Sequence, residues 1–119
     1  MVKILLVEDD PLMQQLIRLY LKKYTNEIDV AGNGRIALKR MNKRKYDILI
    51  TDLQMPEMDG TTLVRTIRNN GDMIPVIVLS SYDKEQVEKM INEPYVDSLR
   101  KPFESSALIQ LLGSFIEIE

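Results

Sequence analysis

We predict an α/β fold in which helices cover both faces of a five-stranded parallel sheet. The first observation is that the most apolar segments are short, continuous and contain β-branched residues, which is typical of strands buried on both faces. The second is that segments with helical periodicity alternate with these runs along the chain. The third is that the 119 residues are 45% hydrophobic, which is enough to form a core without a disulfide or a structural metal.

Five apolar runs are the expected strands. Residues 4–7, 48–50 and 76–79 are continuously apolar and are expected in the middle of the sheet. Residues 28–31 and 95–99 each contain an aspartate. Because an edge strand has a partner on one side only and tolerates charge, we expect these two runs at the edges.

The first helix is expected directly after the first strand. Asp10 stands before Pro11, and this pair favours a helix start because aspartate caps the first turn and proline fits the first helical position. Leu12, Leu16 and Leu19 then recur at the spacing of one helical face.

Three further helices are expected between the remaining strands. The first of them covers residues 35–41, where apolar residues recur among lysines and arginines. The next covers residues 61–69, with Thr61 as its cap and an Asn-Gly pair directly after it. The last covers residues 83–91, with Asp83 as its cap and a proline shortly beyond its end.

The final helix is expected to open at Ser105. Its apolar face is formed by Leu108, Leu111, Leu112 and Phe115. Ile109 and Ile116 fall together on the flank of that face. Two interpretations remain open for this pair: a contact with a partner, or simply a wide core stripe.

Polar side chains follow the expected strands where each strand ends. They are Glu8, Asp9, Asp10, Thr51, Asp52, Ser80, Ser81 and Lys101. Because the carboxyl ends of parallel strands meet at one edge of the sheet, we expect these side chains to converge. Oxygen ligands suit Mg²⁺, and a carboxylate, a hydroxyl and an ammonium around such a cation make a site for a phosphoryl group.

Composition excludes several other kinds of site. The sequence contains no cysteine and no histidine, which removes disulfides, zinc sites with these ligands and Ser-His triads. The formal net charge of −2 argues against nucleic acid as a direct partner. No signal peptide and no apolar run long enough for a membrane span are apparent, so we expect a cytoplasmic protein without a membrane partner.

The motifs together resemble the receiver domain of bacterial two-component response regulators. They are Leu-Val-Glu-Asp-Asp-Pro from residue 6, Asp-Leu-Gln-Met-Pro-Glu-Met-Asp-Gly from residue 52, Ser-Ser from residue 80 and Lys-Pro-Phe from residue 101. The resemblance covers residues 1–119 and implies one receiver domain. It also implies a flavodoxin-like (βα)5 three-layer sandwich with the strand order 2-1-3-4-5.

The resemblance implies a role for each residue of the site. Asp52 matches the phosphoacceptor, and Asp9 and Glu8 match the acidic pair that binds Mg²⁺ directly and through water. Gln54 takes the position whose backbone carbonyl completes the metal site. Ser80 matches the hydroxyl that moves toward the phosphoryl group. Lys101 matches the lysine that pairs with that group, and its bond to the following proline resembles one that is cis in the family.

The sequence departs from the family's pattern at the switch. Ser98 stands where the family commonly has Tyr or Phe, so the aromatic half of the switch is missing or is supplied by another ring such as Tyr95. Gln54 and Tyr82 occupy two positions that affect hydrolysis of the phosphoaspartate, and we expect the Tyr82 ring to shield it from water.

The leading interpretation is a phosphorylation-dependent switch rather than an enzyme acting on an external substrate. Its implied partners are a sensor histidine kinase or histidine phosphotransfer domain and an output protein or domain, with a homodimer through the last strand and helix as one form of output. A receiver-like module that is not phosphorylated is an alternative, but it would be expected to lose Asp52 or Lys101. A phosphohydrolase of the haloacid-dehalogenase type is another, but it needs a second aspartate where this sequence has Gln54.

Overall fold

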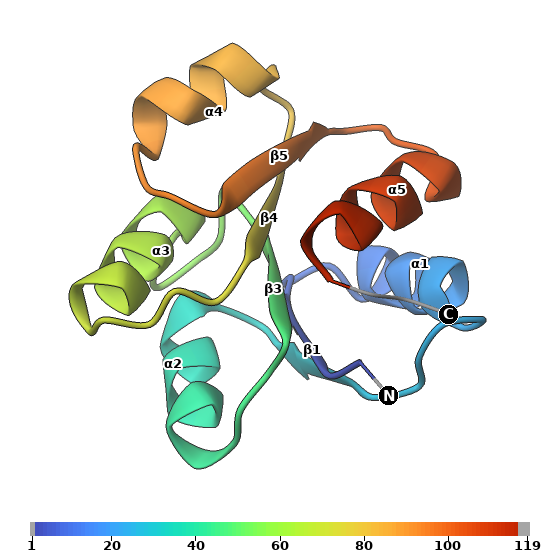
Figure 1. Ribbon diagram of the computed structural model, residues 1–119, viewed down its shortest axis with the longest axis horizontal. Coiled ribbons are helices and arrows are strands. Elements are labelled where there is room, and N and C mark those ends of the chain that lie inside the picture. Colours follow the sequence, from blue (N-terminus) through green and yellow to red (C-terminus); the bar gives the residue numbers. More distant parts are fainter. Residues whose placement is uncertain (1, 117–119) are drawn as a thin grey trace.

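Strands and helices alternate along the whole of residues 2–116, which the computed structural model describes (Figure 1). The strands are β1 (Ile4–Val7), β2 (Ile28–Ala31), β3 (Ile48–Asp52), β4 (Val76–Ser80) and β5 (Val96–Arg100). The helices are α1 (Pro11–Leu21), α2 (Gly34–Lys43), α3 (Gly60–Asn69), α4 (Lys84–Met90) and α5 (Ser105–Phe115). The predicted alternation is therefore confirmed, with shifts of at most two residues at the ends of elements.

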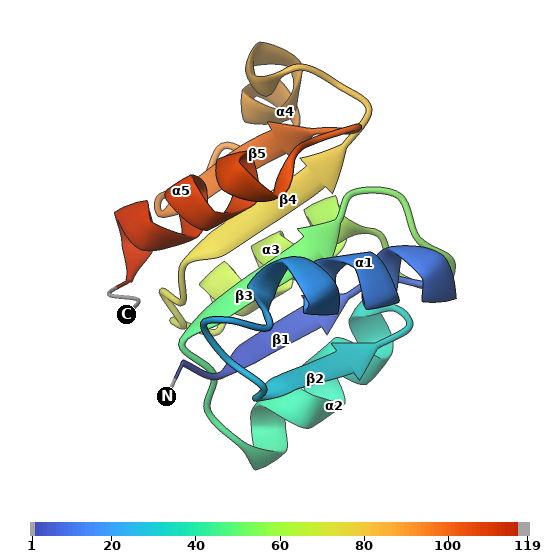
Figure 2. The same ribbon diagram turned by 90° about the vertical axis from the view of Figure 1, so that its right-hand side faces the viewer.

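The strands form one parallel sheet in the order β2-β1-β3-β4-β5. Helices α1 and α5 cover one face and α2, α3 and α4 cover the other, so the molecule has three layers (Figures 1 and 2). The two weaker apolar runs are the edge strands, and the three continuous runs lie between them. The predicted flavodoxin-like architecture is confirmed.

The core lies in two layers, one on each face of the sheet. Alternate residues of the central strands point to opposite faces. Leu5, Leu49 and Val78 pack toward α2, α3 and α4. Leu6 and Ile50 pack toward α1 and α5. All of these side chains have no exposed surface, which is why the central strands read as unbroken apolar runs.

The buried face of α1 differs from the one that the leucine spacing predicts. Leu12 and Leu19 are 76% and 65% exposed, whereas Ile17 and Leu21 are completely buried. The expected stripe is wrong because Ile17 and Leu21 form their own stripe, four residues apart, and the sheet lies on that side. The expected start is confirmed, since the Asp10 side chain accepts a hydrogen bond from the backbone N–H of Leu12.

The cap of α3 also differs from the prediction. Asp59, not Thr61, caps the helix, because its carboxylate accepts a hydrogen bond from the backbone N–H of Thr62 at 2.8 Å. At α4 the predicted cap is confirmed: Asp83 and Gln86 form a reciprocal capping box.

The start of α3 packs directly on the end of β3. Gly60 donates its backbone N–H to the carbonyl oxygen of Leu53 at 2.7 Å. A Cβ atom at residue 60 would lie 2.5 Å from the carbonyl oxygen of Asp52, so only glycine allows this approach. The sequence Asp59-Gly60 therefore fixes where β3 ends and where the Asp52 side chain emerges.

Helix α5 places its predicted apolar face on the sheet. Leu108 and Leu112 are completely buried. Ile109 and Ile116 are partly buried and pack against the same core layer, which favours the interpretation as a wide core stripe. None of the helices within residues 2–116 combines the length and the hydropathy of a transmembrane segment.

Candidate functional site

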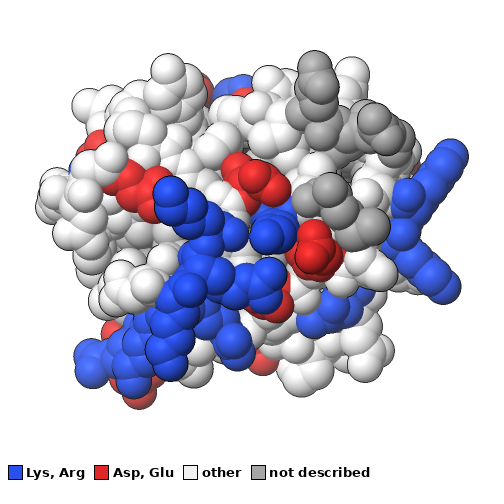
Figure 3. Space-filling model, turned by 60° about the horizontal axis from the view of Figure 1, so that its bottom comes forward, with Lys and Arg blue, Asp and Glu red and all other residues white. Residues whose placement is uncertain are grey.

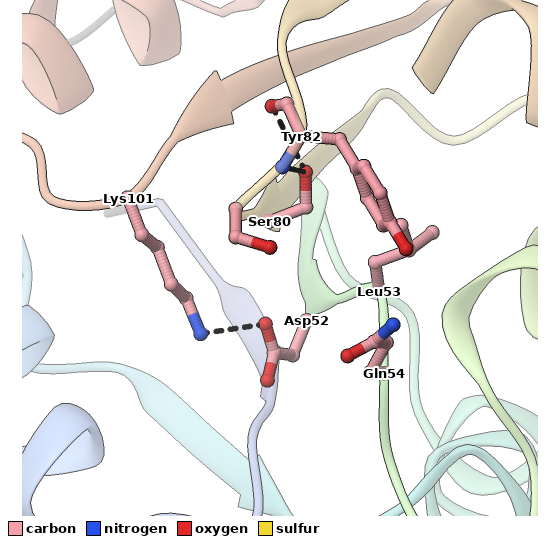
Figure 4. Close-up of a pocket in the computed structure, with 7 residues that line it drawn as sticks. Asp52, Leu53, Gln54, Ser80, Tyr82 and Lys101 are labelled. Carbon is pink, nitrogen blue, oxygen red and sulfur yellow. Dashed lines mark hydrogen bonds and ion pairs between the residues drawn. The ribbon is translucent and has the colours of Figure 1, made fainter. Parts of the chain in front are cut away.

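The carboxyl ends of three central strands and β5 bring the predicted polar residues together. Glu8 and Asp9 follow β1, Asp52 ends β3, Ser80 ends β4 and Lys101 follows β5. Asp52, Ser80 and Lys101 line a cavity of about 240 Å³ together with Leu53, Gln54, Ser81 and Tyr82 (Figure 4). The convergence that the parallel topology predicts is therefore observed.

Three carboxylates form an acidic cluster at this edge. Oxygen atoms of Glu8, Asp9 and Asp52 lie within 4.8 Å of one another. Glu8 and Asp52 are 1% and 8% exposed, whereas Asp9 is open to solvent. Buried carboxylates this close repel each other unless a cation lies near them.

Lys101 supplies one positive charge to this cluster. Its Nζ atom lies 2.7 Å from Oδ1 of Asp52 and 3.5 Å from Oε1 of Glu8. Burial lowers the pKa of Lys101, but the hydrogen bond and charge of Asp52, with those of Glu8, outweigh it, so this pKa lies above its ordinary value. The ammonium is therefore firmly charged at neutral pH and faces the Asp52 carboxylate (Figure 4).

Glu8 is the most constrained carboxylate of the three. Its Oε2 accepts a hydrogen bond from the backbone N–H of Asp10 at 3.1 Å, but its buried Oε1 has no hydrogen-bond partner. Burial raises the pKa of Glu8; the Asp10 hydrogen bond lowers it and the Asp52 charge raises it further, leaving it above its ordinary value. A buried carboxylate oxygen that faces a single ammonium at 3.5 Å, next to two other carboxylates, fits a hard divalent cation with oxygen ligands.

Ser80 lies across the cavity with its hydroxyl held by the next turn. The backbone N–H of Tyr82 donates to Ser80 Oγ at 3.1 Å, and the same hydroxyl lies 3.3 Å from the Tyr82 carbonyl oxygen, which can accept its proton. In Figure 4 the Tyr82 ring extends from this turn toward Gln54. The aromatic ring at the cavity is therefore that of Tyr82.

Ser98 and Tyr95, the two residues considered for the aromatic part of the switch, do not line the Asp52 cavity. Ser98 lies on β5 opposite Val78, is partly buried and does not line the Asp52 cavity. Tyr95 precedes β5 at the amino-terminal end of the sheet and is 61% exposed. The idea that Tyr95 replaces the missing aromatic residue is wrong, because the length of β5 separates it from the level of Ser80.

Sequence reasoning did not identify two residues that shape the site. Leu53 lines the cavity from the strand end, and Gly60 sets the position of Asp52 as described above. The Asp-Gly pair was visible in the sequence as a turn signal, but the closeness of the glycine to Asp52 depends on packing. The bond between Lys101 and Pro102 is cis, as the resemblance implies.

The fold and this edge of the sheet together define a class of protein. Its members have an open parallel α/β sheet, and the strand ends carry an acidic cluster that can bind a cation, beside a lysine. The sequence profile described as "Response regulator receiver domain" matches residues 4–113. The chain belongs to this family, whose members act as phosphorylation-dependent switches in two-component signalling.

Individual relatives agree with this assignment. The probable C4-dicarboxylate response regulator DctR of Bacillus subtilis is 33% identical over 95% of this chain and 51% of its own length. The chemotaxis protein CheY4 of Vibrio cholerae has a TM-score of 0.88 at 26% identity, covering 98% of this chain and 99% of CheY4.

A third relative is described with a bound metal ion. The receiver domain of the sensor histidine kinase PA1611 of Pseudomonas aeruginosa has a TM-score of 0.82 at 29% identity, covering 96% of both chains, and it has a magnesium ion coordinated in its active site cleft. The chain described here spans about half the length of DctR, which is a longer protein.

Proposed function

We propose that Asp52 accepts a phosphoryl group and that this modification switches the protein between two signalling states. The observation that supports this most strongly is the Asp52 carboxylate itself, which ends a central strand at the cavity, 2.7 Å from Lys101 Nζ. An Asp52 oxygen attacks the phosphorus of a phosphohistidine, the P–N bond breaks, and an acyl phosphate forms on Asp52. The released imidazole takes up a proton from water.

We propose Mg²⁺ as the cation of the acidic cluster. Asp9, Asp52 and the backbone carbonyl of Gln54 would hold it directly, and Glu8 would hold it through water. The cluster of three carboxylates, in which the buried Oε1 of Glu8 has no hydrogen bond among residues 2–116, supports this assignment. When bound, the ion supplies positive charge to the phosphoryl oxygens.

Lys101 and Ser80 act on the modified Asp52. The Lys101 ammonium moves from the free carboxylate to a phosphoryl oxygen, which keeps its charge compensated. The Ser80 hydroxyl leaves the Tyr82 backbone and donates to another phosphoryl oxygen, which pulls on the turn after β4. The Tyr82 ring and Gln54 cover the acyl phosphate and slow its hydrolysis.

These 119 residues contain no histidine, so the phosphoryl group comes from a donor outside this receiver domain. We propose a sensor histidine kinase or a histidine phosphotransfer domain as the donor, which places the switch in the cytoplasm. The activity is then limited to self-phosphorylation from a donor and slow self-dephosphorylation, without an external substrate, nucleic acid or membrane.

For the output we propose the β5–α5 side, through either a separate output domain or a second copy. A groove of about 400 Å³ between these elements supports this choice, and it is lined in part by Ser98, Leu99 and Leu111. The small Ser98 side chain leaves this groove open. The turn after Ser80 leads into α4, whose first residue, Lys84, forms an ion pair with Asp97 on β5 at 2.9 Å. A movement of that turn would therefore be transmitted through α4 to the groove.

Intact-protein mass spectrometry after incubation with acetyl phosphate and Mg²⁺ tests the phosphoacceptor. We expect one phosphoryl group on the wild-type protein and none on Asp52→Asn. Asp59→Asn, which changes a cap carboxylate on the same loop, serves as the control and should still be modified.

Two outcomes would contradict the proposal. Equal labelling of Asp52→Asn and the wild type would remove the assignment of Asp52. An unlabelled wild type that turns over p-nitrophenyl phosphate would indicate a phosphohydrolase, and an unlabelled and inactive wild type would indicate an interaction module.

A further inference from the structure

Helix α2 and the loop that follows it carry the densest positive charge in the sequence. Residues 35–45 contain six of the 16 lysines and arginines of the chain and no aspartate or glutamate. They are Arg35, Lys39, Arg40, Lys43, Arg44 and Lys45, and all six are exposed. Figure 3 shows a continuous band of basic side chains over this end of the molecule.

Most of these cations form no ion pair within the part of the chain that the structure describes. Arg44 pairs with Asp29 at 3.0 Å, and Arg35 lies 3.9 Å from Glu57. The other four cations form no ion pair among residues 2–116. The negative end of the helix dipole favours Arg40 and Lys43 in the last turn of α2, but it does not account for Lys39, which directly precedes that turn, or for Lys45, beyond the helix.

An apolar side chain lies among the unpaired cations. Ile36 is 39% exposed. At about 100° per residue, Ile36 shares one face of α2 with Lys39, Arg40 and Lys43. A single exposed isoleucine is common on protein surfaces, but cations surround this one, so a partner that covers it must also compensate their charge.

We propose that this face of α2 binds an acidic segment of a partner protein, rich in Asp and Glu, with an aliphatic side chain that packs on Ile36. The charge of the face is complementary to such a segment, and the helix is about 15 Å long, which matches a short peptide. The rest of the chain carries all 18 acidic residues, which would repel a long phosphate polymer. A phosphate backbone also offers no apolar group to Ile36.

Ile36 lies in the first turn of α2, whereas Lys39 and Lys43 lie farther along the helix, away from the phosphorylation site. Helix α2 begins beside Met58, whose carbonyl oxygen accepts the backbone N–H of Gly34, and runs antiparallel to the strands. Its last turn therefore approaches the amino-terminal ends of the strands, where Asp47 and Lys3 are hydrogen-bonded. The binding should thus be unchanged in Asp52→Asn.

Fluorescence anisotropy with a labelled peptide of Asp and Glu that carries two leucines tests the proposal. The double variant Lys39→Gln/Lys43→Gln should bind about tenfold more weakly than the wild type. Lys22→Gln/Lys23→Gln, which removes the same charge from exposed positions at the end of α1, should bind like the wild type. Lys45→Gln should also weaken binding. Because Lys45 lies outside α2, this loss cannot be caused by a less stable helix.

Two further probes distinguish the kind of partner. Ile36→Ser should weaken binding of the leucine peptide. It should not weaken binding of a matched peptide that has serine in place of leucine. A single-stranded oligonucleotide of equal charge should bind more weakly than the leucine peptide. Equal losses in the α1 and α2 double variants, tighter binding of the oligonucleotide, or no binding of the peptide would each overturn the proposal.

Discussion

Neighbouring carboxylates at the strand ends differ sharply in their surroundings. Asp9 is exposed, whereas Glu8, one residue earlier, is buried with its Oε1 atom 3.5 Å from the Lys101 ammonium. Glu8 directly follows β1, and its side chain is enclosed beside Asp52 and Lys101, whereas Asp9 lies in the loop before α1 and reaches the same cluster from the solvent side. Asp9 therefore offers an oxygen to a cation at little desolvation cost, and Glu8 holds negative charge in place beneath it.

We expect Asp9→Ala to abolish stabilisation by Mg²⁺. For the wild type, an Mg²⁺ concentration about 100 times the dissociation constant should raise the free energy of unfolding by about 2.7 kcal/mol. Asp10→Ala is the matched control: losing its cap on Leu12 should cost about 1 kcal/mol, while the response to Mg²⁺ remains. Urea unfolding with and without Mg²⁺ measures both effects. A wild-type response in Asp9→Ala would count against the metal site.

We expect Glu8→Gln to change how stability depends on pH when no divalent cation is present. Burial raises the pKa of Glu8 in the folded state, so the folded protein binds this proton more tightly than the unfolded chain does. Stability is therefore highest below the unfolded pKa of about 4.5 and falls as pH rises through the folded value. Each unit between the two values costs about 1.4 kcal/mol.

The Glu8→Gln variant should lack this decline and be more stable than the wild type at neutral pH. Urea unfolding in EDTA between about pH 4.5 and pH 7.5 measures the difference. Parallel stability curves for the two proteins would show that Glu8 titrates alike in the folded and unfolded states.

At the scale of elements, α1 shows that the spacing of apolar residues does not by itself predict which face of a helix is buried. Leu12 and Leu19 have the right spacing for an apolar face but lie in solvent. The sheet instead contacts the stripe of Ile17 and Leu21. A helix with apolar residues on two sides can pack against the sheet through either side. The position of the sheet decides which of the two sides is buried.

We expect Ile17→Ala and Leu19→Ala to differ strongly in stability. Ile17 has no exposed surface, so its truncation leaves a cavity and should cost about 2–5 kcal/mol. Leu19 is 65% exposed, and its truncation should change the free energy of unfolding by less than about 0.5 kcal/mol. Chemical denaturation of the two variants measures this directly, and similar losses would mean that α1 is rotated in solution.

At the scale of the whole molecule, one buried arginine connects segments distant in sequence. Arg68, at the end of α3, is 8% exposed and donates hydrogen bonds to the carbonyl oxygens of Asp72, Pro94 and Tyr95. Burial lowers the pKa of Arg68, and the charges of Asp72 and Glu93 partly restore it. The guanidinium thus holds the turn before β5 against α3.

We expect Arg68→Met to cost about 2–4 kcal/mol, because three carbonyl groups lose a charged donor. Arg65→Met is the matched control: Arg65 donates to the carbonyl oxygen of Met90 from an exposed position and should contribute less than about 0.5 kcal/mol. The response to Mg²⁺ should survive in both variants, since Arg68 lies at the opposite end of the sheet. Equal losses from the two substitutions would contradict the special role of Arg68.

The sequence alone determined the strands, their edge or central positions, and the residues at the strand ends. These features are local: a strand buried on both faces must be apolar throughout, and parallel strands bring their carboxyl ends to one edge. Glu8, Asp52 and Lys101 could therefore be assigned to one site although they are far apart in the chain.

Only the tertiary structure decided which helix faces are buried, that Asp59 caps α3, that Tyr95 lies away from Ser80, and that Arg68 is enclosed. It also decided that four of the cations around α2 form no ion pair with any of residues 2–116. Each of these depends on what a side chain meets across the molecule. Spacing along the chain fixes the direction of a side chain within its own helix or strand, but not the neighbour toward which it points.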